Sequence, residues 1–159
     1  MSIERVKKYF EENNIPNRIL EFSSSSATVA LAAEALGTEP CRIAKTMSFW
    51  VADKPIVIVL AGDVKVSNKK FKQFFGAKAK MISFDEVEAA VGHAPGGVCP
   101  FALKEGIKVY LDESIKRFET VFPAAGSANS AVEMTPSELM KYTNAEGYIS
   151  VSEQILEQQ

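Results

Sequence analysis

Cysteine and histidine are scarce in this sequence. Its 159 residues include two cysteines, Cys41 and Cys99, and a single histidine, His93. The cysteines lie far apart without a CxxC pair, and one histidine cannot complete with them the usual ligand set of a structural zinc site. We therefore expect no structural zinc, and thiols that stay reduced in the cytoplasm.

Long apolar runs and a strong net charge are also missing. No apolar run approaches the roughly 18 residues that a membrane span requires, and the N-terminal segment "MSIERVKKYFEENN" lacks the apolar core of a signal peptide. A net charge of −2 gives no overall attraction to nucleic acid, so only a local basic patch could provide it. The composition predicts a cytoplasmic protein with no membrane partner and no DNA partner.

The sequence is rich enough in apolar residues to bury a sizeable core. Hydrophobic residues make up 47% of the chain, and no repeat, low-complexity tract or linker divides it. Helical and strand-like patterns alternate between turn signals. This is typical of an α/β (α+β) fold, and we expect residues 1–159 to form a single domain.

Hydrophobic spacing and turn residues predict the order of the elements. The expected helices cover residues 3–12, 27–36, 68–75, 83–91 and 135–142, and the expected strands cover residues 18–22, 43–51, 55–62, 80–83, 107–112, 118–126 and 147–151. Strands 43–51 and 55–62 should form a hairpin whose second strand is central, and a frayed tail should follow residue 151. Ser26 and Thr135 are the expected N-caps of their helices, and Ser83 and Glu86 have the spacing of a capping box.

Lys45 interrupts an apolar face of the predicted strand 43–51. Alternate side chains of a strand share a face, which places Lys45 beside Met47 and Phe49. An unpaired ammonium is costly to bury, so the position requires a paired anion, a cleft or a ligand. A strand end or a bulge that lets the amine reach water is the alternative.

Residues 92–101 read "GHAPGGVCPF" and predict a shaped loop, because glycine and proline are both poor in helix and strand interiors. Such a loop could carry catalysis through His93 and Cys99, bind a metal, or present backbone amides to a ligand. It could also be a tight structural connection, since glycine and proline often mark turns.

Two of these segments together resemble the YbaK/EbsC family of aminoacyl-tRNA editing domains, which is related to the inserted editing domain of bacterial prolyl-tRNA synthetases. They are "CRIAKTMSF" and, later in the chain, "APGGVCPF". The order of elements from "EFSSSSAT" to "AAGSANSAVEMTPSEL" is also similar, so the resemblance covers nearly the whole chain. It implies a curved, mixed and partly barrel-like sheet surrounded by helices.

The resemblance also implies hydrolysis of mischarged tRNA in trans, as with Cys or Ala on tRNA-Pro, without a metal or organic cofactor. The acceptor end of aminoacyl-tRNA would be the partner, and a synthetase is a further candidate. Lys45, Gly96 and Gly97 correspond to the family's catalytic positions. The implied substrate-binding residues are Phe22, Thr46, His93, Val98, Cys99, Pro100, Ser127 and Asn129.

This chain departs from the family pattern at two places. Phe22 stands where some members have a tyrosine, and "SANSAVEM" supplies Asn129 and Ser130 where a cysteinyl-tRNA deacylase of the family has an aspartate. The identity of the edited amino acid therefore stays open. A non-catalytic module that binds tRNA or a synthetase is the alternative function, and a thiol hydrolase built on Cys99 and His93 is another.

A cluster of lysines suits the backbone of a tRNA acceptor stem. Six lysines occur between residues 65 and 80 with no acidic residue among them, and Lys65, Lys69, Lys70 and Lys72 are the predicted contacts. The spacing of Phe71, Phe74 and Phe75 places them on one buried helix face, with lysines outward. An ordinary solvated helix face is the alternative.

Overall fold

The structure is a computed structural model that describes residues 2–155, and it is arranged around the strand β3 (Lys54–Ala61). Every side chain of β3 from Ile56 to Ala61 is buried. The strand has β2 (Ile43–Val51) on one side, antiparallel, and β5 (Lys108–Asp112) on the other, parallel. A continuous apolar run is typical of a strand with both faces and both edges covered, and its predicted central place is confirmed.

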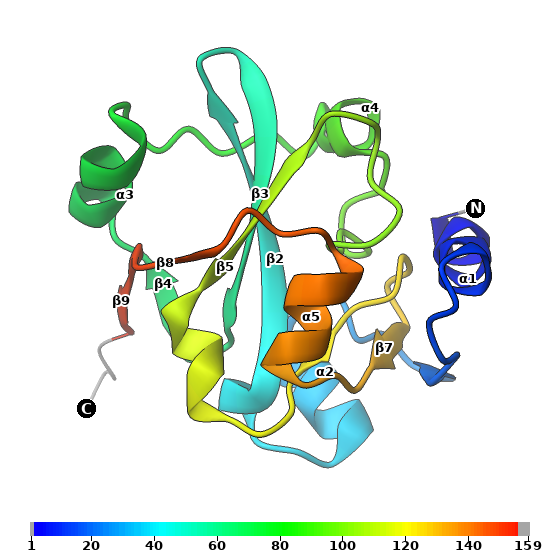
Figure 1. Cartoon of the computed structure of the whole chain (residues 1–159). Helices are drawn as coiled ribbons and strands as arrows, with labels where there is room; N and C mark the ends of the chain where they lie inside the picture. The colour runs from blue at the N-terminus through cyan, green and yellow to red at the C-terminus, as the bar shows by residue number, and fades with distance from the viewer. Residues whose placement is uncertain (1, 156–159) are drawn as a thin grey trace.

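The main sheet has five strands in the order β6-β2-β3-β5-β8, with β6 (Phe122–Pro123) parallel to β2 and β8 (Tyr148–Ile149) parallel to β5. Two smaller antiparallel sheets lie beside it. They pair β1 (Ile19–Glu21) with β7 (Ser130–Val132), and β4 (Val64–Val66) with β9 (Ser152–Gln154). The expected α/β fold with a mixed sheet is confirmed (Figure 1).

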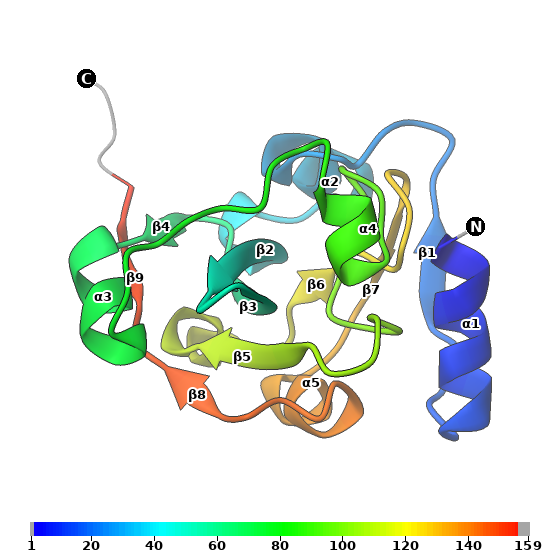
Figure 2. The same cartoon turned by 90° about the horizontal axis from the view of Figure 1, so that it is seen from above.

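The helices surround this sheet, with α2 and α5 on opposite sides of it (Figure 2). Their bounds are α1 (Ser2–Glu12), α2 (Val29–Leu36), α3 (Asn68–Phe75), α4 (Val87–Val91) and α5 (Pro136–Tyr142), with short 3-10 turns η1 (Pro40–Arg42) and η2 (Glu113–Arg117). Thr135 is the N-cap of α5, as predicted, and it forms a capping box with Glu138. None of the helices within residues 2–155 is long and apolar enough to cross a bilayer.

The β2–β3 hairpin has a tighter turn than we expected. Lys54 already pairs with Val51, so the turn consists of Ala52 and Asp53. Both have positive φ, 50° and 63°, as a two-residue turn requires if it is to match the twist of its strands. The pairing of β2 with β3 is continuous from Ala44 to Val51, which excludes a bulge at Lys45.

Two predicted strands are much shorter in the structure. Within 118–126, only Phe122 and Pro123 join the main sheet, and Val121 makes an isolated bridge to Met134. Proline has no N–H for a ladder, so the antiparallel pairing of Val121 with Met134 does not continue through Pro123. Within 80–83, Met81 makes only an isolated bridge to Phe49.

Two predicted helix starts are wrong. Thr28, not Ser26, caps α2, because its hydroxyl accepts from the Leu31 N–H, while the Ser26 N–H and hydroxyl both donate to the Ala128 carbonyl. Helix α4 begins only at Val87, and the Ser83 hydroxyl bonds the Glu86 carboxylate in the preceding turn.

The C-terminal segment is more ordered than a frayed tail up to Gln154. Residues 152–154 form β9, which pairs with β4. The rest of the predicted tail, residues 156–159, lies outside the described residues.

Candidate functional site

A cavity of about 300 Å³ opens where β6 leaves β2. The two strands pair only at Ile43 with Phe122 and at Ala44 with Pro123. Three further segments of the chain enclose the space beyond. The lining residues are Ser26, Ala27, Thr28, Val29, Ala32, Ile43, Ala44, Lys45, Thr46, Gly96, Val98, Phe122, Ala124, Ser130 and Ala131. Lys45 is the one ionisable side chain among these lining residues.

Thr46 brings an unpaired strand edge to this cavity. The backbone groups of successive residues alternate between the two edges of a strand. On the edge of β2 away from β3, the Ser48 carbonyl accepts from the Ile82 N–H, and the Trp50 N–H donates to the Lys80 carbonyl. The Thr46 peptide faces that same edge, beyond the end of β6, and bonds no other backbone group of residues 2–155. The Thr46 hydroxyl is also buried without a hydrogen-bond partner there. A polar group left unpaired in this way is available to a ligand.

Lys45 is half-buried at the wall of the cavity. Its ammonium donates a hydrogen bond to the Val64 carbonyl at the start of β4. Burial lowers the pKa of Lys45, and the negative charge of Asp63 opposes this shift. The amine is therefore held by a neutral oxygen, and its other hydrogen-bond positions are open to an anionic or polar ligand.

The glycine-rich loop contributes Gly96 and Val98 to the cavity. Gly96 has a φ of +86°, a conformation that favours glycine. Gly97 lies behind them. A Cβ on Gly97 would come within 3.0 Å of the Gly126 backbone, and its N–H already donates to the Ala94 carbonyl. Gly97 thus permits two loops to touch.

His93 and Cys99 lie in the hydrophobic core rather than in the cavity, and both are 0% exposed. The His93 Nε2 bonds the Phe101 carbonyl at 2.7 Å, and the Cys99 Sγ lies 3.5 Å from that nitrogen. Burial raises the pKa of the Cys99 thiol to about 12, so it stays protonated at neutral pH. The alternative of a solvent-exposed histidine is wrong, and the geometry offers no substrate access to a thiol nucleophile.

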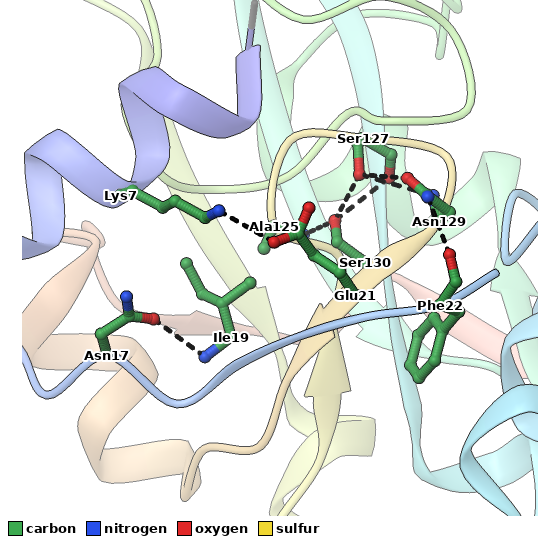
Figure 3. Close-up of polar contacts among 9 residues, drawn as sticks. All are labelled: Lys7, Asn17, Ile19, Glu21, Phe22, Ala125, Ser127, Asn129 and Ser130. Atoms are coloured by element: carbon green, nitrogen blue, oxygen red, sulfur yellow. Dashed lines mark hydrogen bonds and ion pairs between the residues drawn. The ribbon is translucent and has the colours of Figure 1, made fainter.

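The predicted residues of the 19–22 and 125–130 segments hold one wall together (Figure 3). Phe22 and Asn129 exchange backbone and side-chain hydrogen bonds, and the Phe22 ring points away from the Asn129 amide. The Ser127 Oγ lies 2.9 Å from the Asn129 Oδ1 and 2.8 Å from the Ser130 Oγ, so its single proton can bond either oxygen. Among these residues, only Ser130 lines the cavity.

Lys45, Thr46, Gly96 and Val98 are thus the predicted site residues that line the cavity. Phe22, Gly97, His93, Cys99, Pro100, Ser127 and Asn129 do not line it. The start of α2 was missed, although the hydroxyl residues before it mark a helix N-terminus. The alanines that line the cavity carry no signal in the sequence. Within residues 2–155, no three His, Cys, Asp or Glu side chains are grouped to hold a metal ion.

The lysine cluster divides into two sets. Lys65 pairs with Glu153, with Nζ and Oε1 3.6 Å apart, and Lys70 donates to the Ser152 carbonyl at 2.8 Å. Lys69 and Lys72 on α3 are exposed, and their ammonium groups form no hydrogen bond or ion pair with another described residue. The prediction that Phe74 is buried is wrong, because it is 51% exposed.

Comparison with known families identifies residues 23–142, more than half of the chain, as an aminoacyl-tRNA editing domain. The chain belongs to this family. The predicted resemblance is thereby confirmed, since the wider comparisons also include editing-type proteins and prolyl-tRNA synthetases.

Relatives of this editing domain include both free-standing chains and larger enzymes. YwhH of Bacillus subtilis strain 168, an uncharacterized protein, is 51% identical over 152 residues, which are 95% of this chain and 97% of YwhH. The proline–tRNA ligase of Shouchella clausii is 35% identical over 95 residues, which are 59% of this chain and 17% of the ligase. The chain thus spans only a small part of that enzyme.

A solved structure of similar fold is that of a candidate trans-editing enzyme for prolyl-tRNA synthetase. The two chains share 26% sequence identity with a TM-score of 0.87, over 96% of this chain and 97% of the other. The fold of this editing domain therefore also occurs as a free-standing protein.

Proposed function

We propose that this protein, as one unit of residues 1–159, hydrolyses the ester bond of mischarged aminoacyl-tRNA in trans, on substrates such as Cys or Ala attached to tRNA-Pro. The observation that carries the proposal is the cavity that joins the Lys45 ammonium to the unpaired edge at Thr46. The family and its free-standing structural neighbour support the same activity. Because charged tRNA is a cytoplasmic substrate, the proposal places the protein in the cytoplasm.

Positioning and fixed hydrogen-bond donors are sufficient for this reaction, because an aminoacyl ester is far more reactive than an amide. Lys45 would hold the terminal phosphate or ribose. Water would attack the carbonyl carbon. The bond from that carbon to the ribose oxygen breaks, the oxygen takes a proton, and free amino acid and tRNA are released.

The lining of the cavity favours a small, uncharged aminoacyl group. Apart from Lys45 its side chains are neutral, and alanines form much of the wall. No lining carboxylate is available to pair with a basic side chain. The Thr46 carbonyl and hydroxyl supply neutral acceptors for the α-ammonium of the substrate.

A panel of charged tRNAs tests the proposal. Purified protein is incubated with tRNA-Pro carrying Cys, Ala or Pro, and with cognate Cys-tRNA and Ala-tRNA, and the release of amino acid is measured. We expect faster release from the mischarged tRNA-Pro species than without protein. If the protein instead retards these tRNAs in gel mobility and releases nothing, it is a binding module.

A further inference from the structure

The half-buried Lys45 lies beside an ion pair that the proposed reaction does not use. Asp63 occupies the turn between β3 and β4, directly before Val64, whose carbonyl accepts from the Lys45 ammonium. Arg117, at the end of η2, donates from Nη1 to Asp63 Oδ2 at 3.0 Å and from Nη2 to Oδ1 at 2.6 Å. Both carboxylate oxygens are thus directed to the guanidinium.

The guanidinium of Arg117 is itself held in place. Its Nε donates to the Ser114 carbonyl at 2.8 Å, and it stacks over the Phe118 ring with 4.7 Å between Cζ and the ring centroid. Ser114 in turn accepts from the Ala61 N–H of β3 at 3.0 Å, which joins η2 to the strand that leads into the Asp63 turn. A two-point carboxylate contact of this kind fixes geometry as well as charge.

Asp63 is close enough to Lys45 to act on its charge but forms no ion pair with it. The negative charge of Asp63 raises the pKa of Lys45 against the effect of burial, and hydrogen bonding to Arg117 lowers the pKa of Asp63. The Cys41 thiol on η1 is the other titratable neighbour of Asp63. Burial, and the charges of Glu39 and Asp63, raise its pKa above 9.0, so it is neutral at pH 7.

We propose that Arg117 is a positioning residue for Lys45, because its guanidinium keeps the Asp63 carboxylate from pairing directly with the Lys45 ammonium. The ammonium then rests on the neutral Val64 carbonyl and keeps hydrogen-bond capacity for the substrate. Without Arg117, Asp63 would turn to the nearest free cation and occupy the group that the substrate needs. The catalytic consequence of this inference rests on the proposed function, whereas the effect of Arg117 on the pairing of Lys45 does not.

The decisive experiment is a rescue. Arg117→Gln should lower the deacylation rate about tenfold, because the released Asp63 pairs with Lys45. Adding Asp63→Asn to Arg117→Gln should return the rate to within about threefold of the original protein, because the competing carboxylate is gone. A merely structural ion pair predicts no rescue, and a double variant as slow as Arg117→Gln overturns the proposal.

A pH titration of Lys45 by NMR, with 13C-labelled lysine assigned through Lys45→Arg, measures the effect without using activity. Arg117→Gln should raise the pKa of Lys45, and Asp63→Asn should lower it. Arg18→Gln is the matched control, since Arg18 forms an equally exposed pair with Glu138, 40% against 39% exposure of the two arginines. It should leave the pKa of Lys45 unchanged.

The two measurements distinguish a failure of the proposed function from a failure of the positioning role. If the titrations move as expected but no variant, nor the original protein, releases amino acid from any charged tRNA, the proposed function fails and the positioning of Lys45 stands. If the pKa of Lys45 is the same in the original protein, in Arg117→Gln and in Asp63→Asn, the positioning role is overturned whatever the activity. Melting temperatures of the variants verify that they are folded.

Discussion

Asp112 and Lys45 are both charged side chains that the fold withdraws from water, but the chain satisfies their hydrogen bonds very differently. Asp112 is 0% exposed and accepts from the Ser114 N–H, the Val151 N–H and the Ser152 hydroxyl at 2.7–2.9 Å. Lys45 has a single carbonyl partner among residues 2–155 and faces a cavity. A saturated buried charge holds structure together, whereas an unsaturated one is available to a ligand.

The largest effect expected from this contrast is the loss of Asp112. Asp112→Ala removes the acceptor of the buried Val151 N–H, the partly buried Ser114 N–H and the Ser152 hydroxyl, which should lower the free energy of unfolding by about 3 kcal/mol. Denaturation by urea measures it. Asp85→Ala, at an exposed aspartate, is the control and should change stability by less than about 0.5 kcal/mol. If Asp112→Ala also lowers the free energy of unfolding by less than about 0.5 kcal/mol, the contrast between Asp112 and Lys45 is refuted.

Replacing Lys45 should have the opposite pattern. Lys45→Ala should slow deacylation at least about tenfold, or roughly 1.4 kcal/mol of transition-state stabilisation, while stability changes by less than about 1 kcal/mol. Thermal melts and deacylation rates are measured on the same preparation. A lower melting temperature with unaltered activity of the folded protein would make Lys45 a structural residue and remove the main support for the proposed function.

Thr46 extends the comparison of saturated and unsaturated buried groups to a neutral group, its hydroxyl. Thr46→Val keeps the shape and removes a buried hydroxyl that has no partner, so the protein should become about 1 kcal/mol more stable while substrate binding weakens. Thr143→Val is the matched control, because that hydroxyl donates to the Leu139 carbonyl at 2.6 Å, and its loss should destabilise. Destabilisation by both variants would show that Thr46 has a structural partner after all.

His93 has one saturated and one unpaired ring nitrogen, since its buried Nδ1 has no partner among the described residues. Burial lowers the pKa of His93 from 6.5. Below that pH the unfolded chain binds a proton that the folded protein does not, so stability should fall as the pH drops from 6.5 to the folded-state pKa. Urea denaturation between about pH 7 and pH 5 measures it. His93→Gln should flatten this slope, and an equal slope in both proteins would assign it to other groups.

The smallest effect concerns the two sets of lysines. If Lys69 and Lys72 meet phosphates, replacing both with Gln should reduce the salt dependence of tRNA binding by a slope of about 2. Lys65→Gln with Lys70→Gln is the control, because these side chains already bond Glu153 and Ser152, and it should change the slope less. Equal changes from both pairs would remove the distinction between them.

Local signals predicted the elements that depend on a few adjacent residues. The predicted N-cap at Thr135 is formed, and Gly37 and Gly76 end α2 and α3 close to the predicted helix ends. The cap of α2 was misplaced because Ser26 and Thr28 are both suitable, and only the bond from Ser26 to Ala128 decides between them. The length of β6 depends on a partner strand distant in the chain, which no local pattern reveals.

The site was predictable only where a residue breaks a pattern. Lys45 interrupts an apolar strand face, and the glycines at 96 and 97 mark a loop. In contrast, the burial of His93 and Cys99 results from packing against distant segments, and Gly97 approaches the backbone of Gly126 rather than the cavity. The unpaired Thr46 edge exists because β6 ends after two residues, a consequence of topology alone.

The dispersed walls of the cavity also determine when it forms during folding. The β2–β3 hairpin joins neighbouring residues and can close early, whereas the parallel pairings of β2 with β6 and of β3 with β5 join distant parts of the chain and pay a larger loop-closure entropy. The cavity needs residues from Ser26 to Ala131 in place. A partly folded chain would therefore contain Lys45 on a formed strand but no pocket, and we expect the ability to bind aminoacyl-tRNA to appear only with the slowest folding phase.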